Sequence, residues 1–140
     1  MNLRVTFDCS GVNWNTVSRT LKRVGMGYYE PEIHRKAFEN SHTTVFVYDG
    51  DQLVAFGRAI SDDAYQAAVY DMAVAPEYQR QGIGATIMEH IMKRVRNCNV
   101  ILYAAVGNEA FYEKIGLRRM RTGMALFKES VEMKKKGFTE

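Results

Sequence analysis

The chain has 140 residues, of which 46% are hydrophobic and 25% are charged, and it contains only 2 prolines and 2 cysteines. This composition is that of an ordinary globular protein and excludes the collagen-like, disordered and disulfide-framework classes. The length predicts a single domain over residues 1–140.

The distribution of charge and cysteine limits the partners. The formal charge is +3, and much of the excess is the run Lys134–Lys136, so a solvated basic tail explains it and no nucleic-acid partner is expected. No apolar run approaches the roughly 20 residues that a membrane span needs, and the first residues lack the pattern of a secretion signal. Because Cys9 and Cys98 form no CxxC, no metal site is expected and a reducing cytoplasm is the expected location.

The first part of the chain predicts one strand and two helices. Apolar and polar residues alternate over Leu3–Phe7, which is typical of a strand. Over Trp14–Val24 the apolar residues recur every three or four positions, which predicts a helix. A proline at the start of Pro31–Asn40 suits the first turn of a second helix, and Tyr28 and Tyr29 lie in the link between the two helices.

The middle of the chain predicts three strands and a longer helix. Thr43–Tyr48 and Gln52–Ile60 are rich in β-branched and aromatic residues, and the Asp-Gly between them is a strong hairpin signal. A third strand is predicted over Gln66–Val74, where a following proline ends it. In Gly82–Val95 an apolar residue recurs at every fourth position, which predicts a helix packed on the sheet.

The last part predicts the end of the sheet. Val100–Val106 is almost wholly apolar, which predicts a central strand covered on both faces. Glu109–Ile115 is expected to be a short helix with Gly116 as its C-terminal cap. Arg118–Met120 and Met124–Phe127 are predicted to be two short closing strands, followed by a basic, frayed tail. These elements together predict a mixed α/β fold around one sheet.

The segment from Val69 to Gly84 carries most of the chemical information, because it joins a predicted strand to a predicted helix through a glycine-containing turn. Backbone N–H groups at a helix start converge on one concavity at the positive end of the helix dipole and can hold a pyrophosphate. For Gly82 and Gly84 alone, the simpler interpretation is structural: they would only allow the helix to start close to the sheet. Neither a Walker loop nor a Rossmann fingerprint is present. The surrounding sequence pattern must therefore distinguish a phosphate-binding loop from a structural helix start.

Two motifs resemble those of the GCN5-related N-acetyltransferases. Gln79-x-x-Gly82-x-Gly84 is similar to the acyl-CoA loop of that family, written Gln/Arg-x-x-Gly-x-Gly/Ala. Phe111-Tyr-Glu-Lys-x-Gly-Leu is similar to the signature that joins the fifth strand to the fourth helix. The resemblance covers residues 3 to about 128, and around Tyr112 it is nearest to small bacterial members related to arylalkylamine N-acetyltransferases.

The resemblance implies a fold and a reaction. The fold would be the GNAT fold, a mostly antiparallel sheet that splays between its fourth and fifth strands, flanked by about four helices. The reaction would move an acetyl group from acetyl-CoA to the primary amine of a small molecule, directly within a ternary complex and without a metal. A non-catalytic CoA-binding regulatory module and a protein N-acetyltransferase are the alternatives, and a homodimer is compatible with the resemblance.

The resemblance also implies roles for individual residues. Tyr112 would be the general acid for the departing thiolate, because a phenol with a pKa of about 10 is protonated at neutral pH; a tyrosine packed at a helix start is the alternative. Asp71 is the candidate general base, or else a structural carboxylate. Tyr28 and Tyr29 would line the acceptor pocket, or only pack the link. The residues assigned to acetyl-CoA are Met72, Ala73, Val74, Gln79, Arg80, Gln81, Gly82, Ile83, Gly84, Ala85, Asn108 and Phe111.

Asn108 departs from the family pattern, because many members place the asparagine further before the tyrosine. His34, His42 and His90 show no metal-ligand spacing, so we expect them on the surface or in packing. The amine acceptor itself is not readable from the sequence.

Overall fold

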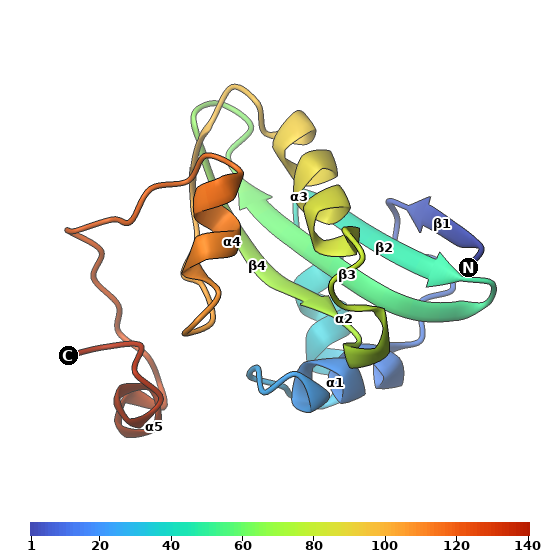
Figure 1. Ribbon diagram of the computed structural model, residues 1–140, viewed down its shortest axis with the longest axis horizontal. Helices are drawn as coiled ribbons and strands as arrows, with labels where there is room; N and C mark the ends of the chain where they lie inside the picture. Colours follow the sequence, from blue (N-terminus) through green and yellow to red (C-terminus); the bar gives the residue numbers. More distant parts are fainter. The chain divides into compact units, whose positions relative to one another are not determined.

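Five β-strands and five α-helices make up the computed structural model of the chain, which describes all 140 residues (Figure 1). Met1–Leu102 form one compact unit and Tyr103–Glu140 form a second. The first unit contains the whole sheet, in which the strands lie side by side in chain order from β1 to β5. The mixed α/β class predicted from the sequence is confirmed.

The predicted elements up to residue 95 are confirmed, with small differences at their ends. Strands β1 to β4 pair antiparallel, and β5 pairs parallel to β4. The elements of the first unit are β1 (Leu3–Thr6), α1 (Trp14–Arg23), α2 (Pro31–Glu39), β2 (Thr43–Asp49), β3 (Gln52–Ser61), β4 (Gln66–Val74), the 3-10 helix η1 (Pro76–Tyr78), α3 (Ile83–Arg94) and β5 (Asn99–Ile101).

Apolar side chains fill the space on both faces of the sheet. Helix α3 covers one face, and α1 with α2 lies at the other (Figure 1). On the α1–α2 side, the ring of Phe38 lies 5.6 Å from that of Phe46 and 5.9 Å from that of Phe56, and Trp14 packs against the same cluster. On the α3 side, Ile87 and its apolar stripe are buried. Burying each such large side chain contributes roughly 1.5–3 kcal/mol.

Strand β4 contains a β-bulge opposite Gly57. On β3, Phe56 pairs with Ala73 and Arg58 pairs with Tyr70. Gly57, between them, therefore lies opposite two residues of β4. One of these two, Asp71, has a φ of +55°, a left-handed conformation that aspartate tolerates better than most residues. A bulge bends its strand and increases the local twist.

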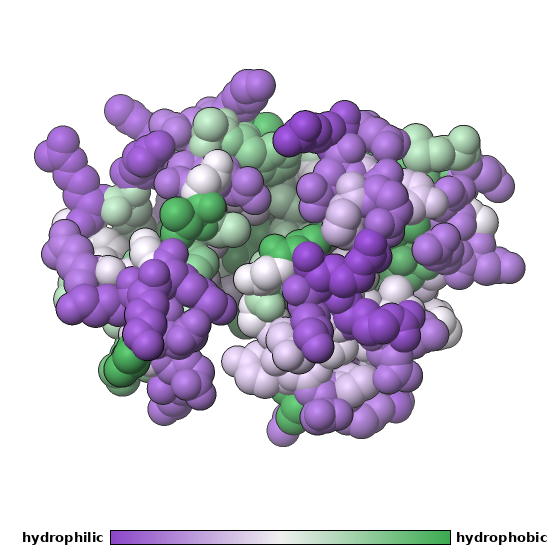
Figure 2. All heavy atoms as spheres, turned by 60° about the horizontal axis from the view of Figure 1, so that its bottom comes forward, coloured by the Kyte–Doolittle hydropathy of each residue, from purple (hydrophilic) through white to green (hydrophobic).

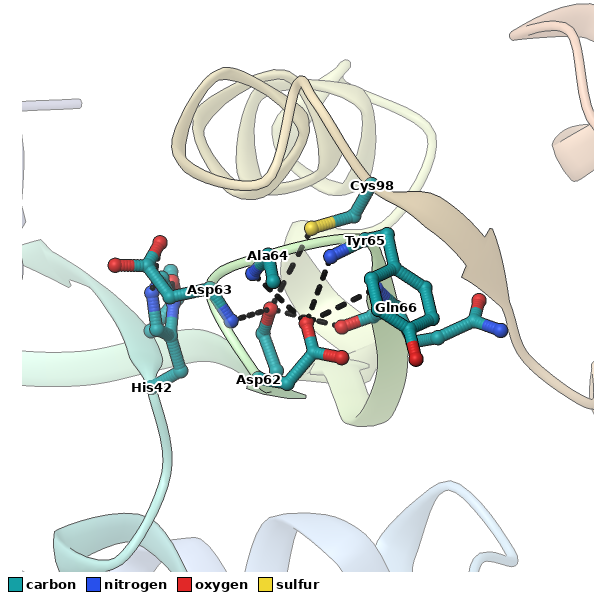
Figure 3. A network of polar contacts seen from close by, with 9 residues as sticks. His42, Asp62, Asp63, Ala64, Tyr65, Gln66 and Cys98 are labelled. Carbon is teal, nitrogen blue, oxygen red and sulfur yellow. Dashed lines mark hydrogen bonds and ion pairs between the residues drawn. The ribbon is translucent and has the colours of Figure 1, made fainter.

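The turn between β3 and β4 is held by the side chain of Asp62 (Figure 3). Its carboxylate accepts hydrogen bonds from the backbone N–H groups of residues 64–66 at 2.8 to 3.0 Å, and these bonds lower its pKa. The hydroxyl of Ser61 donates to the carbonyl oxygen of Gln66 at 2.9 Å, and the thiol of Cys98 lies 3.6 Å from that hydroxyl. These bonds fix the start of β4, where β5 pairs with it.

The predicted central strand over Val100–Val106 is wrong. The strand that forms is β5, which ends at Ile101 and lies at the edge of the sheet. It pairs only with Gln66–Ala68 of β4, and the side chain of Ile101 is 52% exposed. An apolar run indicates a strand but not how many neighbours that strand has, so the sequence overestimated both its length and its burial.

The two predicted closing strands are also wrong. Arg118–Met120 and Met124–Phe127 pair with no strand, and Met124 and Leu126 are 96% and 91% exposed. An extended segment becomes a strand only where a partner supplies the ladder hydrogen bonds, and a sequence pattern does not supply that partner.

The expected frayed tail instead contains helix α5 (Ser130–Lys135). Its lysines lie in the last turn, where cations favour the negative end of the helix dipole. After the helix, the ring of Phe138 lies 5.8 Å from that of Tyr103 and 6.5 Å from that of Phe127. These aromatic contacts hold the end of the second unit.

The predicted cap at Gly116 is confirmed. Helix α4 (Glu109–Lys114) is followed by Gly116 with a φ of +103°. The N–H of Gly116 donates to the carbonyl of Glu113 and that of Leu117 donates to the carbonyl of Tyr112, both at 3.1 Å. This pair of bonds is the Schellman motif, in which a left-handed glycine satisfies the last carbonyls of a helix.

Polar and charged side chains cover most of the face seen in Figure 2, and apolar atoms appear there in small areas. None of the helices combines the length and the apolar character needed to cross a membrane.

We expect Gly57→Ala to destabilise the protein. A Cβ at this position would lie 3.0 Å from Cγ2 of Ile87 and 3.3 Å from Cγ of Met72, so α3 would have to move away from the sheet. Overpacking of this kind costs about 2 kcal/mol, which urea denaturation would measure. As a control, Gly27→Ala adds a Cβ in open space at an ordinary φ and should change the free energy of unfolding by less than about 0.5 kcal/mol. Equal stabilities of the two variants would contradict the close packing at Gly57.

Candidate active site

The loop between η1 and α3 presents a row of free backbone donors. Gly82 is the N-cap of α3 with a φ of +83°, Arg80 has a φ of +64°, and no side chain caps the helix. The N–H groups of residues 82–85 donate to no acceptor in the chain. No atom lies within 4 Å of a Cβ built on Gly82. The loop is therefore open to an anion at the positive end of a helix.

Two of the predicted cofactor residues use their side chains to shape this loop. The side-chain amide of Gln79 donates to the carbonyl oxygen of Val74 at 3.0 Å, and that of Gln81 donates to the carbonyl of Glu77 at 3.4 Å. Arg80 forms no ion pair, so its guanidinium is available beside the loop.

The short helix η1 is clamped on both sides, which the sequence did not predict. Nη1 and Nη2 of Arg23, in the last turn of α1, donate to the carboxylate of Glu77, and this contact lowers the pKa of Glu77. The hydroxyl of Tyr78 donates to Oδ2 of Asp49 at 2.6 Å, and this bond lowers the pKa of Asp49. Exposed pairs of this kind add little stability, but they set where the loop begins.

The end of β4 has an open edge. Since β5 pairs only with Gln66–Ala68, residues 69–74 have no strand on that side. The N–H of Ala75 donates to the carbonyl of Val54 on β3, so the alternation of an antiparallel ladder directs the N–H and C=O of Val74 to the open side. An open edge of this kind can bind an extended chain that carries amides.

The side chains of the other two predicted strand residues point into the protein. Ala73 is buried in the cluster on the α1–α2 side, and Met72 lies next to Gly57 beneath α3. They can therefore contribute to a bound molecule through their backbone and not through their side chains.

Asp71 forms an ion pair that the sequence did not reveal. Its Oδ2 accepts a hydrogen bond from Nε of Arg58 at 2.7 Å, and the side chains are 21% and 14% exposed. The same guanidinium donates to the hydroxyl of Ser41 at 3.3 Å and lies over the rings of Phe38 and Tyr70. A single cation inside an otherwise uncharged strand was the signal that could have identified Arg58.

Tyr28 and Tyr29 lie in the α1–α2 link, as predicted, with exposed fractions of 48% and 63%. The hydroxyl of Ser18 donates to the carbonyl of Tyr29 at 2.7 Å, and the N–H of Tyr29 donates to Nε2 of His34 at 2.9 Å. His34 is only 3% exposed. Its spacing of four residues from buried Phe38 on α2 was the available signal that it faces inward.

The second motif forms the start and body of α4. Asn108 is the N-cap but makes no side-chain capping bond. The rings of Phe111 and Tyr112 meet edge to face with centroids 5.0 Å apart. Burial raises the pKa of Tyr112, so its phenol is protonated at neutral pH and can donate a proton.

A cavity lined by Phe7, Phe38 and Arg94 contains none of the predicted site residues. It has a volume of about 400 Å³ and lies at the C-terminal end of α3, at Arg94, whereas the loop lies at the N-terminal end. Its polar groups already have partners: Asp8 accepts from Ser10, and His42 contacts Asp63. No group of three or more His, Cys, Asp or Glu residues is arranged to hold a metal.

Comparisons with known proteins place the chain among acetyltransferases. The model of the acetyltransferase (GNAT) family matches residues 12–117. The chain is 28% identical over 111 residues to the uncharacterized N-acetyltransferase ycf52 of Porphyra purpurea and 30% identical over 115 residues to the chloroplastic serotonin N-acetyltransferase 2 of Oryza sativa subsp. japonica. These matches cover 77% and 76% of this chain but only 59% and 57% of the two relatives.

A solved structure is similar over nearly the whole chain. It is that of SA2161 from meticillin-resistant Staphylococcus aureus, a protein of unknown function named a probable acetyltransferase. The TM-score is 0.81 at 31% identity, and the match covers 89% of this chain and 98% of the other.

The pairing of Asp71 with Arg58 can be tested by removing the acidic charge. Asp71→Asn keeps a residue that tolerates a positive φ but leaves a mostly buried guanidinium unpaired, so we expect a loss of about 2 kcal/mol in the free energy of unfolding. The double variant with Arg58→Met should recover part of this loss. As a control, Glu89→Gln breaks the exposed pair with Lys93 and should cause no measurable loss. If Asp71→Asn is as stable as the wild type, the ion pair does not hold the bulge.

Proposed function

The chain belongs to the GNAT acetyltransferase family, and on that premise we propose that it transfers an acetyl group from acetyl-CoA to the primary amine of a small molecule. The observation that carries the proposal is the loop from Gln79 to Ala85, with its free N–H donors at the start of α3. A diphosphate with two negative charges is the ligand class that such a loop suits best. We also propose direct transfer in a ternary complex, with no covalent intermediate on the chain.

The donor side of the reaction would be served by backbone groups. The N–H groups of residues 82–85 would hold the pyrophosphate, with the free guanidinium of Arg80 as a counter-charge. The open edge of β4 would pair with the amides of the pantetheine arm. When bound, acetyl-CoA supplies an activated acetyl thioester. The N–H of Val74, which faces the open edge, is suited to hydrogen-bond the thioester oxygen and stabilise the charge that develops there.

Proton transfer would involve Tyr112 and Asp71. The phenol of Tyr112, with its pKa raised by burial, would give its proton to the departing thiolate. Asp71, with its carboxylate oriented by Arg58, would accept the proton of the amine directly or through a water molecule. The assignment of Tyr112 is supported by its place in the second motif and by this chemistry.

The acceptor side would be formed by the α1–α2 link. The exposed rings of Tyr28 and Tyr29 offer π-faces to a cationic or aromatic amine, and Glu30 and Glu32 follow directly in the sequence. The rice relative is named a serotonin N-acetyltransferase, which supports a small amine as the acceptor class.

Titration calorimetry tests the donor assignment directly. We expect acetyl-CoA and CoA to bind with micromolar affinity and ATP to bind much more weakly, because the pantetheine arm adds contacts along β4. A screen of amines, with release of free thiol as the readout, would then test the transfer. A folded protein that binds no acetyl-CoA would refute the proposed function.

The phosphate loop can be tested with Gly82→Val. A β-branched residue disfavours a φ of +83°, and its Cβ would stand in front of the free N–H groups, so we expect at least a tenfold loss of acetyl-CoA affinity. Gly11→Val is the matched control, because Gly11 has a similar φ of +71° in open space away from the loop. It should lose stability but keep its affinity for acetyl-CoA. Equal affinities of both variants would contradict the assignment of the loop.

The role of Tyr112 can be tested with Tyr112→Phe. Removal of the acid should lower kcat about a hundredfold and leave the affinity for acetyl-CoA unchanged. Tyr65→Phe, at an exposed position in the turn before β4, is the control and should keep the full rate. Equal losses of rate and affinity in Tyr112→Phe would mean that the hydroxyl is structural.

A further inference from the structure

One side chain from each of the two helices forms a hydrogen bond to the backbone of the link between α1 and α2. The carbonyl of Tyr29 accepts a hydrogen bond from the hydroxyl of Ser18 on α1, and its N–H donates to Nε2 of His34 on α2. The ring of Tyr29 also lies against the imidazole, with centroids 5.7 Å apart. Both backbone polar groups of Tyr29 are therefore fixed, while the residue as a whole is 63% exposed.

The hydrogen bond from Tyr29 requires a neutral imidazole. Because Nε2 of His34 accepts, it carries no proton, and the single N–H of the neutral ring is on Nδ1. A protonated imidazole has an N–H on both nitrogens. The proton on Nε2 would then point at the N–H of Tyr29. Because two donors cannot form a hydrogen bond with each other, protonation breaks the bond between Tyr29 and His34.

The surroundings of His34 favour this neutral form. Burial is the main cause that lowers the pKa of His34, Asp71 on β4 raises it, and the guanidinium of Arg58 on β3 lowers it. These last two charges largely oppose one another because they form an ion pair. At neutral pH the imidazole is therefore uncharged and the link is held.

We propose that His34 is a positioning residue for the amine acceptor: its neutral imidazole holds the Tyr28–Tyr29 link in place, and protonation of the imidazole releases the link. The inference rests on the proposed function in one respect, namely that these two tyrosines contact the amine. Release would leave the rings of Tyr28 and Tyr29 without a fixed position, and the affinity for the amine would fall.

The direction of the pH effect follows from the lowered pKa of His34. In the unfolded chain the imidazole binds a proton near pH 6.5, whereas in the folded chain it does so only at a lower pH. The contribution of His34 to the free energy of unfolding is therefore complete above about pH 6.5. It is lost as the pH falls toward the pKa of the folded state, and the link opens as the pH passes through that value.

Amide hydrogen exchange measured by NMR tests the link without any substrate. At pH 7.5, His34→Leu removes the acceptor, and we expect the amide of Tyr29 to exchange at least tenfold faster than in the wild type. His34→Gln places an amide oxygen near the position of Nε2 and should stay within about threefold of the wild type. His90→Gln, on α3, is the control and should not change this exchange.

The pH dependence separates titration of His34 from a general loosening of the fold. As the pH falls from about 6.5 toward the lower pKa of the folded imidazole, the wild-type Tyr29 amide should lose protection beyond the intrinsic effect of pH. His34→Gln should keep its protection, because an amide does not titrate. Ser18→Ala removes the other anchor, and its loss of protection should be the same at every pH.

Steady-state kinetics test whether the link positions the amine. With acetyl-CoA and the best acceptor among serotonin, tyramine and spermidine, His34→Leu should raise KM for the amine about tenfold. We expect little change in kcat or in KM for acetyl-CoA, and His34→Gln should restore KM for the amine. The rise in KM on acidification should be present in the wild type and absent in His34→Gln.

Three outcomes separate the inference from the function on which it rests. If the exchange of the Tyr29 amide is unchanged in His34→Leu, His34 does not hold the link. If the exchange becomes faster but KM for the amine does not change, His34 holds the link but does not position the amine. If the wild type acetylates none of the three amines, the proposed function with those acceptors fails instead. The hydrogen exchange of the Tyr29 amide and its pH dependence then show whether His34 holds the link.

Discussion

The extra residue in β4 opposite Gly57 is the constraint on which the candidate site depends. The bulge turns Asp71 into a left-handed conformation, where its carboxylate meets Arg58. The same bulge bends β4 just beyond the three residues that pair with β5, and a bend of that kind separates neighbouring strands. Gly57, which has no side chain, lets α3 approach the sheet at this level. An open strand edge and the start of a helix therefore lie on either side of one turn.

The loop before α3 shows why backbone groups can define a binding site. Helix starts always leave N–H groups without intrahelical partners, and most helices satisfy some of them with a capping side chain. Helix α3 begins with glycine instead, and its donors stay free. Side chains hold the loop in place, through the bond from Gln79 to the carbonyl of Val74 on β4 and through the contacts of Arg23 and Asp49 with η1. The donors are thus preorganised by residues that need not contact the ligand.

The features that the sequence predicted well are those with local causes. The β2–β3 hairpin follows from Asp-Gly between two strand patterns, and the end of α4 follows from Gly116. What the sequence could not show depends on residues distant in the chain: the contact between Asp71 and Arg58 and the short β5. The segment with Met124 and Leu126 has a strand pattern but no partner, which a pattern cannot supply. The two motifs identified the family, while the contacts that support them required the structure.

Helix α1 links the two sides of the proposed reaction. Ser18 in its middle holds the link that would contact the amine, and Arg23 in its last turn holds the segment that leads into the phosphate loop. Any shift of α1 would therefore reach both of the proposed binding regions at once. Thermodynamic linkage requires that such coupling be reciprocal: if binding of acetyl-CoA improves the affinity for the amine, the amine improves the affinity for acetyl-CoA by the same factor. A rigid helix shared by two binding regions thus favours assembly of the complete complex over either half of it.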